Sequence, residues 1–449
     1  MAAGKGTRMK SALPKVLHKL AGRALLRHVV DMSARLRPRR SIVVTGHGAD
    51  EVEASLSDTA ALFVRQMPQR GTGHAVQQTV AVLDDGNAIT LILYGDVPLI
   101  SEASARALVQ ACSGTRLALL SFEPADPARY GRIVRDAAGA VQAIVECKDA
   151  TSVQRAIGEV YSGIMAAPTA MLKRWVMALK DDNAQHEFYL TDVVAMAVAE
   201  GVPVVAQITP DEFEVAGVND ALQLVALERE FQRRQANELL KQGVRLADPA
   251  RFDQRGTLVC GSDVEIDIGC IFEGEVHLAD GVRIGAHCVL RDARIEARSV
   301  IHPFTHIDGA VVGAGALIGP YARLRPGAEL GAGVHIGNFV EVKNSTLAAG
   351  AKANHLAYLG DATVGERVNF GAGSITANYD GAQKHRTVIG NDVHVGSNCV
   401  LVAPVTLGDG ATIGGGSTIA KDAPAGQLTV ARARQATLGG WVRPKKPAK

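Results

Sequence analysis

The chain has 449 residues, of which 47% are hydrophobic and 21% charged, the balance of a folded protein with two or three domains rather than a disordered one. The formal net charge of +2 argues against bulk binding to nucleic acid, but it permits a local basic site for phosphates. No apolar run approaches the roughly 18 residues of a membrane-spanning helix, and the six cysteines form no CxxC pair. We therefore expect a reduced, cytoplasmic protein that acts on small-molecule substrates, with no nucleic acid and no membrane as partner.

The chain opens with a glycine-rich basic loop, Gly4-Lys5-Gly6-Thr7-Arg8, and Leu13-Pro14-Lys15 follows it closely. Glycine lets backbone N–H groups crowd around phosphate oxygens. Arg8 and Lys15 can neutralise the charge that builds on a departing pyrophosphate. The loop matches neither GxxxxGK[ST] nor GxGxxG, so it predicts a phosphate site of another kind.

No strand precedes this loop. A phosphate loop should leave the end of a buried strand, yet only Met1 stands before Ala2-Ala3-Gly4. A missing strand would cost three or four buried aliphatic side chains, each worth about 1.5–3 kcal/mol, in a domain whose whole stability is about 5–15 kcal/mol. We therefore expect the natural chain to begin a few residues upstream with an apolar run. We also expect the shorter form to lose the chemistry of this domain selectively.

Strands and helices alternate through the first half. Residues 41–45, 90–94 and 116–121 read as apolar strands, and residues 73–83 and 102–112 read as helices. This alternation predicts an α/β domain with a mostly parallel sheet covered by helices on both faces. Ligands bind such sheets beyond the C-terminal ends of the strands, which is where Tyr94-Gly95-Asp96 lies.

Ala2–Met9 followed by Leu13–Leu17 resembles the sugar nucleotidyltransferase family, which has a Rossmann-like domain. The resemblance implies that UTP and the UDP-N-acetylglucosamine product are bound by Ala2, Ala3, Gly4, Lys15, Gln66, Gly71, Thr72, Tyr94, Gly95, Asp96, Gly131, Glu146 and Asn219. Within that set it places Gln66 at the uracil and Gly131 and Glu146 at the acetylated sugar.

The resemblance also implies a magnesium ion held by Asp96 and Asn219, with Arg8 and Lys15 as catalytic cations. A sugar-1-phosphate oxygen would attack the α-phosphorus of UTP, and pyrophosphate would leave in line. Such a step needs positioning and charge stabilisation more than a proton-transfer residue. One position departs from the family: Tyr161 stands where related enzymes carry an Asn that contacts the sugar nucleotide, so that contact is in doubt here.

A long helical segment follows at residues 220–243, with Leu222, Leu227 and Phe231 among charged residues. We take it as the connection between two domains. The expected organisation is therefore a uridyltransferase domain over residues 1–221, a linker helix over 222–242 and a second domain over 243–449.

The second domain carries a six-residue period. Val312, Ile318, Leu324, Leu330, Ile336 and Val342 are each six apart, and so are Ile389, Val395, Leu401, Leu407, Ile413 and Ile419. A hexad with an aliphatic anchor is typical of a parallel β-helix, here expected to be left-handed, in which three hexads make one coil. The period breaks near 348–359 and 376–387, and insertions in solenoids become loops on one face.

His355 lies at the first break, beside Tyr358. An amine is protonated near neutral pH, so its attack on a thioester needs a base, and histidine is the side chain whose ordinary pKa is close to working pH. Arg325 and Lys343 are cations suited to a sugar phosphate. These features favour acyl transfer to an amino sugar.

Five segments of the second domain occur in a fixed order, at residues 323–327, 338–344, 354–361, 369–373 and 376–381. Together with the motifs of the first domain, they resemble the family of bifunctional bacterial N-acetylglucosamine-1-phosphate uridyltransferase/glucosamine-1-phosphate acetyltransferases. The resemblance covers essentially the whole chain. The resemblance implies that His355 is the general base and that residues 376–387 form a flap over the thioester. It implies amino-sugar-phosphate contacts at Arg325, Lys343, Tyr358 and Asn369. It implies acetyl-CoA contacts at Ala372, Asn378, Tyr379, Ser397, Gly415 and Arg432.

Three other interpretations stay open at this point. The β-helix could serve only for assembly or regulation of a uridyltransferase, or the whole chain could be a trimeric scaffold. A zinc site could also use His302 and His306 with a third histidine. We expect instead acetylation of glucosamine-1-phosphate by acetyl-CoA, then uridyl transfer from UTP, in a homotrimer whose active sites lie between neighbouring subunits.

Overall fold

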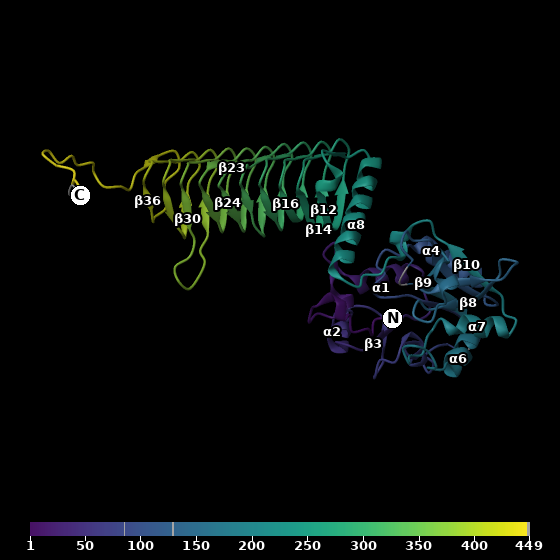
Figure 1. Ribbon diagram of the computed structural model, residues 1–449. Helices are drawn as coiled ribbons and strands as arrows, with labels where there is room; N and C mark the ends of the chain where they lie inside the picture. Colours follow the sequence, from purple (N-terminus) through teal and green to yellow (C-terminus); the bar gives the residue numbers. More distant parts are fainter. Residues whose placement is uncertain (85, 128–129, 447–449) are drawn as a thin grey trace. The chain divides into compact units, whose positions relative to one another are not determined.

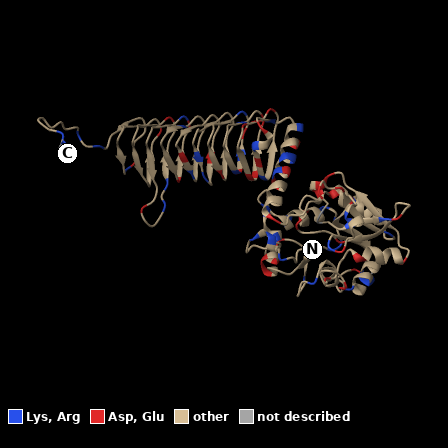
Figure 2. Cartoon of the chain, viewed as in Figure 1, with Lys and Arg blue, Asp and Glu red and all other residues tan. Residues whose placement is uncertain are grey.

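The computed structural model describes residues 1–84, 86–127 and 130–446 (Figure 1). The chain forms two compact units, Met1–Phe231 and Gln232–Lys449, and the division falls inside helix α8 (Ala221–Lys241). Acidic and basic side chains are interspersed along α8 (Figure 2). Within the described ranges, no helix is both long and apolar enough to cross a bilayer.

The N-terminal unit is an α/β domain. Its strands are β1 (Lys19–Leu20), β2 (Arg23–Ala24), β3 (Ile42–Thr45), β4 (Leu62–Arg65), β5 (Ile89–Ile92), β6 (Leu117–Phe122), β7 (Arg132–Arg135), β8 (Val141–Val145), β9 (Val160–Pro168) and β10 (Val204–Ile208). Its helices before α8 are α1 (Leu25–Arg35), α2 (Ala49–Ala54), α3 (Thr72–Gln77), α4 (Glu102–Cys112), α5 (Ser152–Arg155), α6 (Thr169–Ala178) and α7 (Asp192–Ala199). The main sheet has the order β10-β6-β9-β7-β8 with β5 beside β9, and β3 pairs with β4 separately.

The predicted strands and α4 lie close to the expected residues, and two details differ. The sheet is mixed, because β9 runs antiparallel to β5 and β6, whereas β3 and β4 are parallel, as are β6 and β10. Helix α3 ends at Gln77 instead of continuing to residue 83. The Thr79 hydroxyl donates to Val76 O at 2.7 Å, a local bond that competes with continued helix.

The N-terminal unit contains an apolar cavity of about 430 Å³ between β3 and β5. The first residues of the chain enter the gap between these strands: Ala2 N donates to Val44 O at 2.8 Å, and the Met1 amine donates to Leu93 O at 2.6 Å. The apolar side chains that line the cavity from outside the two strands include Leu26, Val29 and Val30 of α1, Val76 of α3, Val82 and Leu83 after α3, and Val109 of α4. The cavity therefore has the position and lining of one further buried strand.

Joining an apolar pentapeptide ahead of Met1 should fill this cavity and stabilise the unit. Each aliphatic side chain that it buries contributes about 1.5–3 kcal/mol, against roughly 1–2 kcal/mol for ordering each backbone residue. We expect the Tm of the N-terminal transition to rise by several degrees. A Gly-Ser extension of equal length should leave Tm unchanged, and equal effects of the two extensions would contradict this role for the cavity.

The Met1 amine supplies a control on the same prediction. Burial lowers the pKa of this amine from 8.0 to about 6. Between those values the unfolded chain binds the proton and the folded chain does not, so the stability of the unit should rise with pH from about 6 to 8. The apolar extension turns the amine into a peptide bond and should abolish that rise in urea unfolding curves.

The C-terminal unit is a parallel β-helix whose coils stack along one axis (Figure 1). One sheet contains β11 (Arg245–Leu246), β13 (Glu265–Ile266), β15 (Arg283–Ile284), β17 (Val300–Ile301), β20 (Leu317–Ile318), β23 (His335–Asn338), β26 (Lys352–His355), β29 (Asn369–Phe370), β32 (His394–Val395), β35 (Thr412–Ile413) and β37 (Leu428–Thr429). A second, continuous sheet forms the other two sides and contains β12 (Phe252–Cys260), β14 (Cys270–Leu278), β16 (Val289–Ile295), β18 (His306–Asp308), β19 (Ala310–Val312), β21 (Arg323–Leu324), β22 (Ala328–Leu330), β24 (Glu341–Lys343), β25 (Ser345–Leu347), β27 (Tyr358–Gly360), β28 (Ala362–Val364), β30 (Ile375–Ala377), β31 (Thr387–Ile389), β33 (Val400–Val402), β34 (Val405–Leu407) and β36 (Thr418–Ile419).

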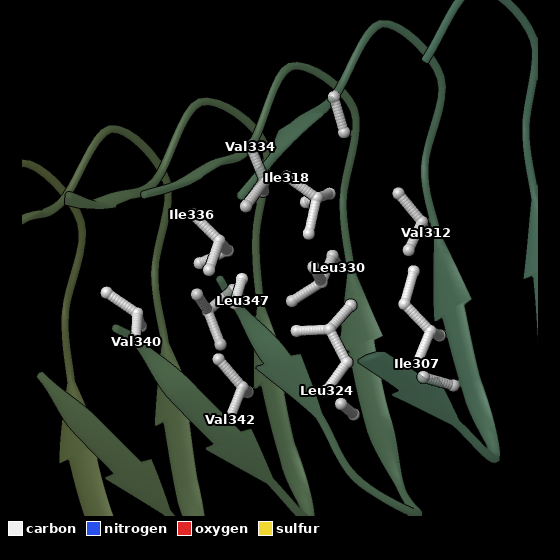
Figure 3. Close-up of a cluster of buried hydrophobic side chains, with 14 of the residues drawn as sticks. Ile307, Val312, Ile318, Leu324, Leu330, Val334, Ile336, Val340, Val342 and Leu347 are labelled. Carbon is white, nitrogen blue, oxygen red and sulfur yellow. The ribbon is translucent and has the colours of Figure 1, made fainter. Parts of the chain in front are cut away.

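The predicted hexad anchors form the core of this solenoid. All twelve are at most 4% exposed, and Figure 3 shows several of them pointing into the interior from successive coils. Because each anchor packs on its equivalent one coil away, burial is continuous along the axis. The fold class expected from the sequence, an α/β nucleotidyltransferase domain with a hexapeptide β-helix, is confirmed.

The two breaks in the period have different structural origins. At the first break no loop forms: Ile336 pairs with Ala353, and Leu347 pairs with Val364, each 17 positions later. Two successive coils are therefore each one residue shorter than three hexads. At the second break Val364 pairs with Ile389, 25 positions later, and the extra residues form the loop that projects after β30 (Figure 1).

Candidate functional site

Four residues predicted for the first site meet beyond the end of β5. Lys15 Nζ forms an ion pair with Asp96 Oδ2 and lies 3.3 Å from Asn219 Oδ1. Arg8 Nη2 donates to the same Asn219 oxygen at 2.9 Å. The two predicted phosphate cations thus contact the two predicted metal ligands, although the residues come from opposite ends of the domain.

The phosphate-type loop is held close to this cluster. Gly6 has φ 60°, and a Cβ at this position would lie 2.5 Å from Lys15 Cβ, so only glycine fits. Val218 N donates to Asp96 O at 2.9 Å and holds the segment of Asn219 against the strand end. The sequence interpretation gave Gly6 no role of its own. This role depends on the close approach of the Lys15 segment, which the sequence pattern alone does not show.

Gln66 lies in a second part of this site. Its Nε2 donates to Gly71 O at 2.9 Å and lies 3.2 Å from His74 Nδ1. Burial, with the charge of Arg70, lowers the pKa of His74 and favours the neutral ring. With both amide hydrogens engaged, the Gln66 carbonyl oxygen is the group that can accept from a ligand N–H. Thr72 Oγ1, in the same loop, accepts from Leu190 N at 3.0 Å.

The residues predicted for the sugar are also near one another. A Cβ on Gly131 would lie 3.7 Å from Glu146 Cδ, and Glu146 Oε1 accepts from Thr191 Oγ1 at 3.1 Å. Burial raises the pKa of the Glu146 carboxyl, opposed by that hydrogen bond. A Cβ on Gly163, where φ is 94°, would lie 2.9 Å from the Tyr94 ring.

Tyr161, the residue that departs from the family pattern, is buried in the same region. Its hydroxyl donates to Gly163 O at 2.7 Å, within strand β9. Its ring belongs to the core that contains Met165 and Trp175. The tyrosine therefore has a packing role. Its hydroxyl is committed to the backbone that supports Tyr94.

The C-terminal site begins with His355 at the end of β26. Asn338 is its register partner on β23, and His355 Nδ1 lies 2.8 Å from Asn338 Oδ1. His355 is exposed, so a substrate can reach the ring. Asn369, on the next strand, places its amide 3.2 Å from His394 Nδ1.

Three predicted contacts for a sugar phosphate lie in another column of the solenoid. Arg325 N donates to Val342 O, so Arg325 and Lys343 occupy adjacent coils. Lys343 is in register with Gly360 on the next coil, and a Cβ on Gly360 would lie 2.2 Å from the Tyr358 hydroxyl. Because residue 360 is glycine, the Tyr358 hydroxyl has room to lie in this column, directly after the two cations.

The predicted acetyl-CoA contacts continue the column of His355 along one corner of the solenoid. The same backbone bond repeats from coil to coil: Gly373 N to His355 O, Asn398 N to Ala372 O, and Gly416 N to Ser397 O, at 2.8–3.1 Å. Arg432 Nη1 donates to Gly415 O at 2.5 Å. A Cβ on Gly415 would lie 3.4 Å from Ser397 O, so alanine would also fit there.

The loop after β30 brings Asn378, which was predicted to contact acetyl-CoA, to Asp361, a residue that sequence analysis did not assign. Asn378 Nδ2 donates to Asp361 Oδ2, and Asn344 Nδ2 donates to the other oxygen of this carboxylate. Burial opposes ionisation of Asp361, but these bonds and the nearby charge of Lys384 hold its pKa below the ordinary value. Lys384 also lowers the pKa of Lys343, and Arg325 adds to that effect.

Lys384 thus joins Arg325 and Lys343 in a group of three cations. Tyr379 forms an isolated bridge with Lys384, and its exposed hydroxyl donates to Gly381 O at 2.6 Å. A basic residue inside the second break of the hexad period was the signal that could have identified Lys384.

The remaining predicted contacts are backbone positions. Ala2 and Ala3 are buried at the sheet, Gly95 N donates to Met1 O at 2.8 Å, and Gly4 is exposed with open space around its Cα.

Among the described residues, no group of three His, Cys, Asp or Glu side chains could hold a metal ion. Asp96 and Asn219 together offer hard oxygen donors that converge on one point, the Lys15 ammonium.

Two family models match the chain. The MobA-like NTP transferase domain matches residues 1–160, and the bacterial transferase hexapeptide repeat matches residues 309–344 and 386–421. A solved nucleotidyl transferase from Methanothermobacter, 21% identical, covers 52% of this chain and 95% of its own with a TM-score of 0.38.

Full-length relatives are much more similar. The bifunctional protein GlmU of Methylibium petroleiphilum is 72% identical over 99% of this chain and 98% of its own length. That of Albidiferax ferrireducens is 64% identical over 99% of both chains, and that of Cupriavidus pinatubonensis is 57% identical over 100% and 99%. The similarity includes both units and the segment that joins them.

Proposed function

Because this chain belongs to the family of the bifunctional protein GlmU, we propose how its two units divide two successive reactions. The protein is an enzyme of UDP-N-acetylglucosamine synthesis. Its C-terminal unit acetylates glucosamine-1-phosphate with acetyl-CoA, and its N-terminal unit transfers UMP from UTP to the product and releases pyrophosphate. The observation that carries the assignment is the straight column from His355 through Ala372 and Ser397 to Gly415.

The column fits an elongated thioester whose reactive end lies beside His355. Parallel strands are about 4.8 Å apart, so the three coil steps from His355 to Gly415 span roughly 14 Å. Arg432 lies at the far end, where it can meet the charged end of the cofactor. His355 takes a proton from the sugar amine as nitrogen attacks the thioester carbonyl, and coenzyme A leaves as the thiol.

The cations beside this column would bind the phosphate of the amino sugar. Arg325, Lys343 and Lys384 form a group of cations. Of the carboxylates beside it, Glu341 forms an ion pair with Arg325 at 2.8 Å, and Asp361 is held by two asparagine amides. Such a cluster favours an anion. The Tyr358 hydroxyl lies next in the column, at a place where it can reach the sugar ring.

The charged side chains beyond the end of β5 are suited to uridyl transfer. Lys15 and Arg8 lie where the triphosphate enters, and they would stabilise the charge on the departing pyrophosphate. The Gln66 carbonyl can accept the imide N–H of uracil, and Gly131 lets the sugar approach Glu146. Proximity and alignment supply most of the acceleration in such a step.

We assign the metal site of this reaction to Asp96 and Asn219. Carboxylate and amide oxygens are ligands that Mg²⁺ prefers, and both contact the same ammonium group in the structure. When bound there, Mg²⁺ would supply charge neutralisation on the nucleotide phosphates. The Lys15 ammonium, which now contacts both oxygens, would then be available to the triphosphate.

We further propose that the enzyme acts in the cytoplasm as a homotrimer with small molecules as its substrates. The hexapeptide β-helix exposes the aromatic and aliphatic side chains of Phe304, Tyr321, Phe339 and Leu356 along one corner. This row borders the His355 column. Packing it against a neighbouring subunit would cover apolar surface beside the site.

The test of this function is a reaction without UTP. Incubation with glucosamine-1-phosphate and acetyl-CoA should release free thiol, followed with a thiol reagent, in proportion to the N-acetylglucosamine-1-phosphate formed. A β-helix that serves only for assembly or regulation would release none. The same protein should release pyrophosphate from UTP when given ready-made N-acetylglucosamine-1-phosphate.

Replacing Lys384 should weaken binding of the amino sugar through its phosphate. A hydrogen bond to a charged group contributes about 1.5–3 kcal/mol, so Lys384→Met should raise the KM for glucosamine-1-phosphate roughly 10- to 100-fold. Lys421→Met, an exposed site on the same unit, is the matched control. Turnover of unphosphorylated glucosamine should be the same in both variants, and an equal loss on both substrates would contradict the role in phosphate binding.

A further inference from the structure

We propose that Asn338 is a positioning residue that fixes the tautomer of His355 in the acetyl-transfer reaction, an inference that rests on the proposed function of the C-terminal site. Asn338 ends β23, and His355 ends β26 directly beside it in the parallel register. The two side chains leave the same corner of the solenoid on successive coils. Their contact is therefore built into the stacking of two coils.

The chemistry of the contact follows from the atoms involved. Asn338 Oδ1 lies 2.8 Å from His355 Nδ1. A carbonyl oxygen can only accept, so Nδ1 carries the hydrogen, and in the neutral ring the lone pair is on Nε2. A base must present a lone pair to the proton that it removes. The bond to Asn338 therefore selects the one neutral tautomer in which Nε2 can act.

An asparagine suits this position better than a carboxylate. A neutral amide orients the ring without holding a proton on it, whereas an adjacent carboxylate would favour the charged imidazolium, which cannot act as a base. Other basic side chains already lie near. Burial lowers the pKa of His335, which is on the same strand as Asn338, and the charges of Lys352, His302 and His355 lower it further. On β29, the Asn369 amide lies 3.2 Å from His394 Nδ1.

The backbone also supports the arrangement. Leu356 N donates to Asn338 O at 3.1 Å, so the residue after His355 is tied to the same asparagine. Leu356 has φ 51°, and this turn directs the chain away after His355. The loss of one residue in this coil brings Ile336 and Ala353 into register and thereby aligns the two polar side chains.

Two substitutions separate positioning from structure. Asn338→Leu removes the acceptor and should lower kcat for acetyl transfer about 10- to 100-fold, the range seen when metal-bound histidines lose their orienting partners. KM for both substrates should be nearly unchanged. Asn338→Asp keeps an acceptor, so kcat at high pH should be retained. Its charge should move the acid limb of the pH–rate profile to higher pH.

Controls make each outcome decisive. Asn391 also joins two coils, since its Oδ1 accepts from Glu366 N at 2.8 Å, and Asn391→Leu should leave kcat and the pH profile unchanged. Acetyl transfer that survives His355→Ala would refute the proposed base itself. If His355→Ala abolishes acetyl transfer while both Asn338 variants keep the original kcat and acid limb, the positioning role is wrong.

Discussion

Asp96→Ala should abolish pyrophosphate release while acetyl transfer continues at nearly its normal rate. Asp96 is one of the two oxygen ligands proposed for Mg²⁺, and its ion pair holds Lys15 beside Asn219. Its loss would therefore remove the metal ligand and release the main phosphate cation. The residues proposed for acetyl transfer all lie in the other unit. The measurement is a pair of assays on one preparation, pyrophosphate from UTP and thiol from acetyl-CoA.

Two controls identify the cause of the loss. Asp50→Ala removes an exposed carboxylate of the same unit, which pairs with Arg65 at the surface, and should change neither activity. Raising the magnesium concentration should partly restore Asp96→Asn, which keeps an oxygen donor, but not Asp96→Ala. Loss of both activities with the fold intact would contradict the assignment of two independent sites.

His355→Ala should lower acetyl transfer by roughly 10²–10⁴-fold, the usual contribution of a general base. Uridyl transfer from ready-made N-acetylglucosamine-1-phosphate should be unchanged, because the substitution leaves the N-terminal unit untouched. The fold should persist as well, since the ring of His355 is exposed and no core packing is lost. Single-turnover measurement of thiol release isolates the chemical step from product release.

A histidine elsewhere on the solenoid provides the comparison. His277 projects from β14 to the exterior, and His277→Ala should be as active as the parent protein. Near-normal acetyl transfer by His355→Ala would mean that another group removes the proton. An equal loss in both histidine variants would point to a general effect on the solenoid instead.

Sequence pattern predicted the β-helix well because its physical requirement is local and repeated. Every sixth residue must fill the same narrow interior, so anchors such as Ile318 and Leu401 are visible without knowledge of the fold. The first break in the period was predicted to be an insertion, but the coil there is one residue shorter than three hexads. A deletion disturbs the period in the same way as an insertion. Only the register of Ile336 with Ala353 distinguishes the two cases.

The α/β unit was harder to predict because its decisive contacts are distant in sequence. The antiparallel course of β9 depends on pairing with β5 and β6, and nothing in the residues 160–168 alone specifies that direction. The contact of Arg8 with Asn219 likewise joins residues 211 positions apart. Motif resemblance suggested these residues, and the structure supplies the geometry that brings them together.

The contributions of Asn338 and Lys384 could not be derived from residue type. An asparagine at the end of a hexad is ordinarily a turn residue, and its value arises only when the next coil places His355 at 2.8 Å. Lys384 lies in a loop whose path depends on Asn378 and Asp361. Both roles depend on tertiary placement rather than on local pattern.

In the proposed function, one chain acetylates first and then transfers UMP, at two separate sites. The most direct test is to mix the protein with glucosamine-1-phosphate, UTP and Mg²⁺ and to follow pyrophosphate before and after acetyl-CoA is added. The account predicts almost no pyrophosphate at first, then release of thiol followed by an equal amount of pyrophosphate. Rapid pyrophosphate release before acetyl-CoA is present would contradict this order, and thiol release with no pyrophosphate after it would contradict the coupling of the two sites.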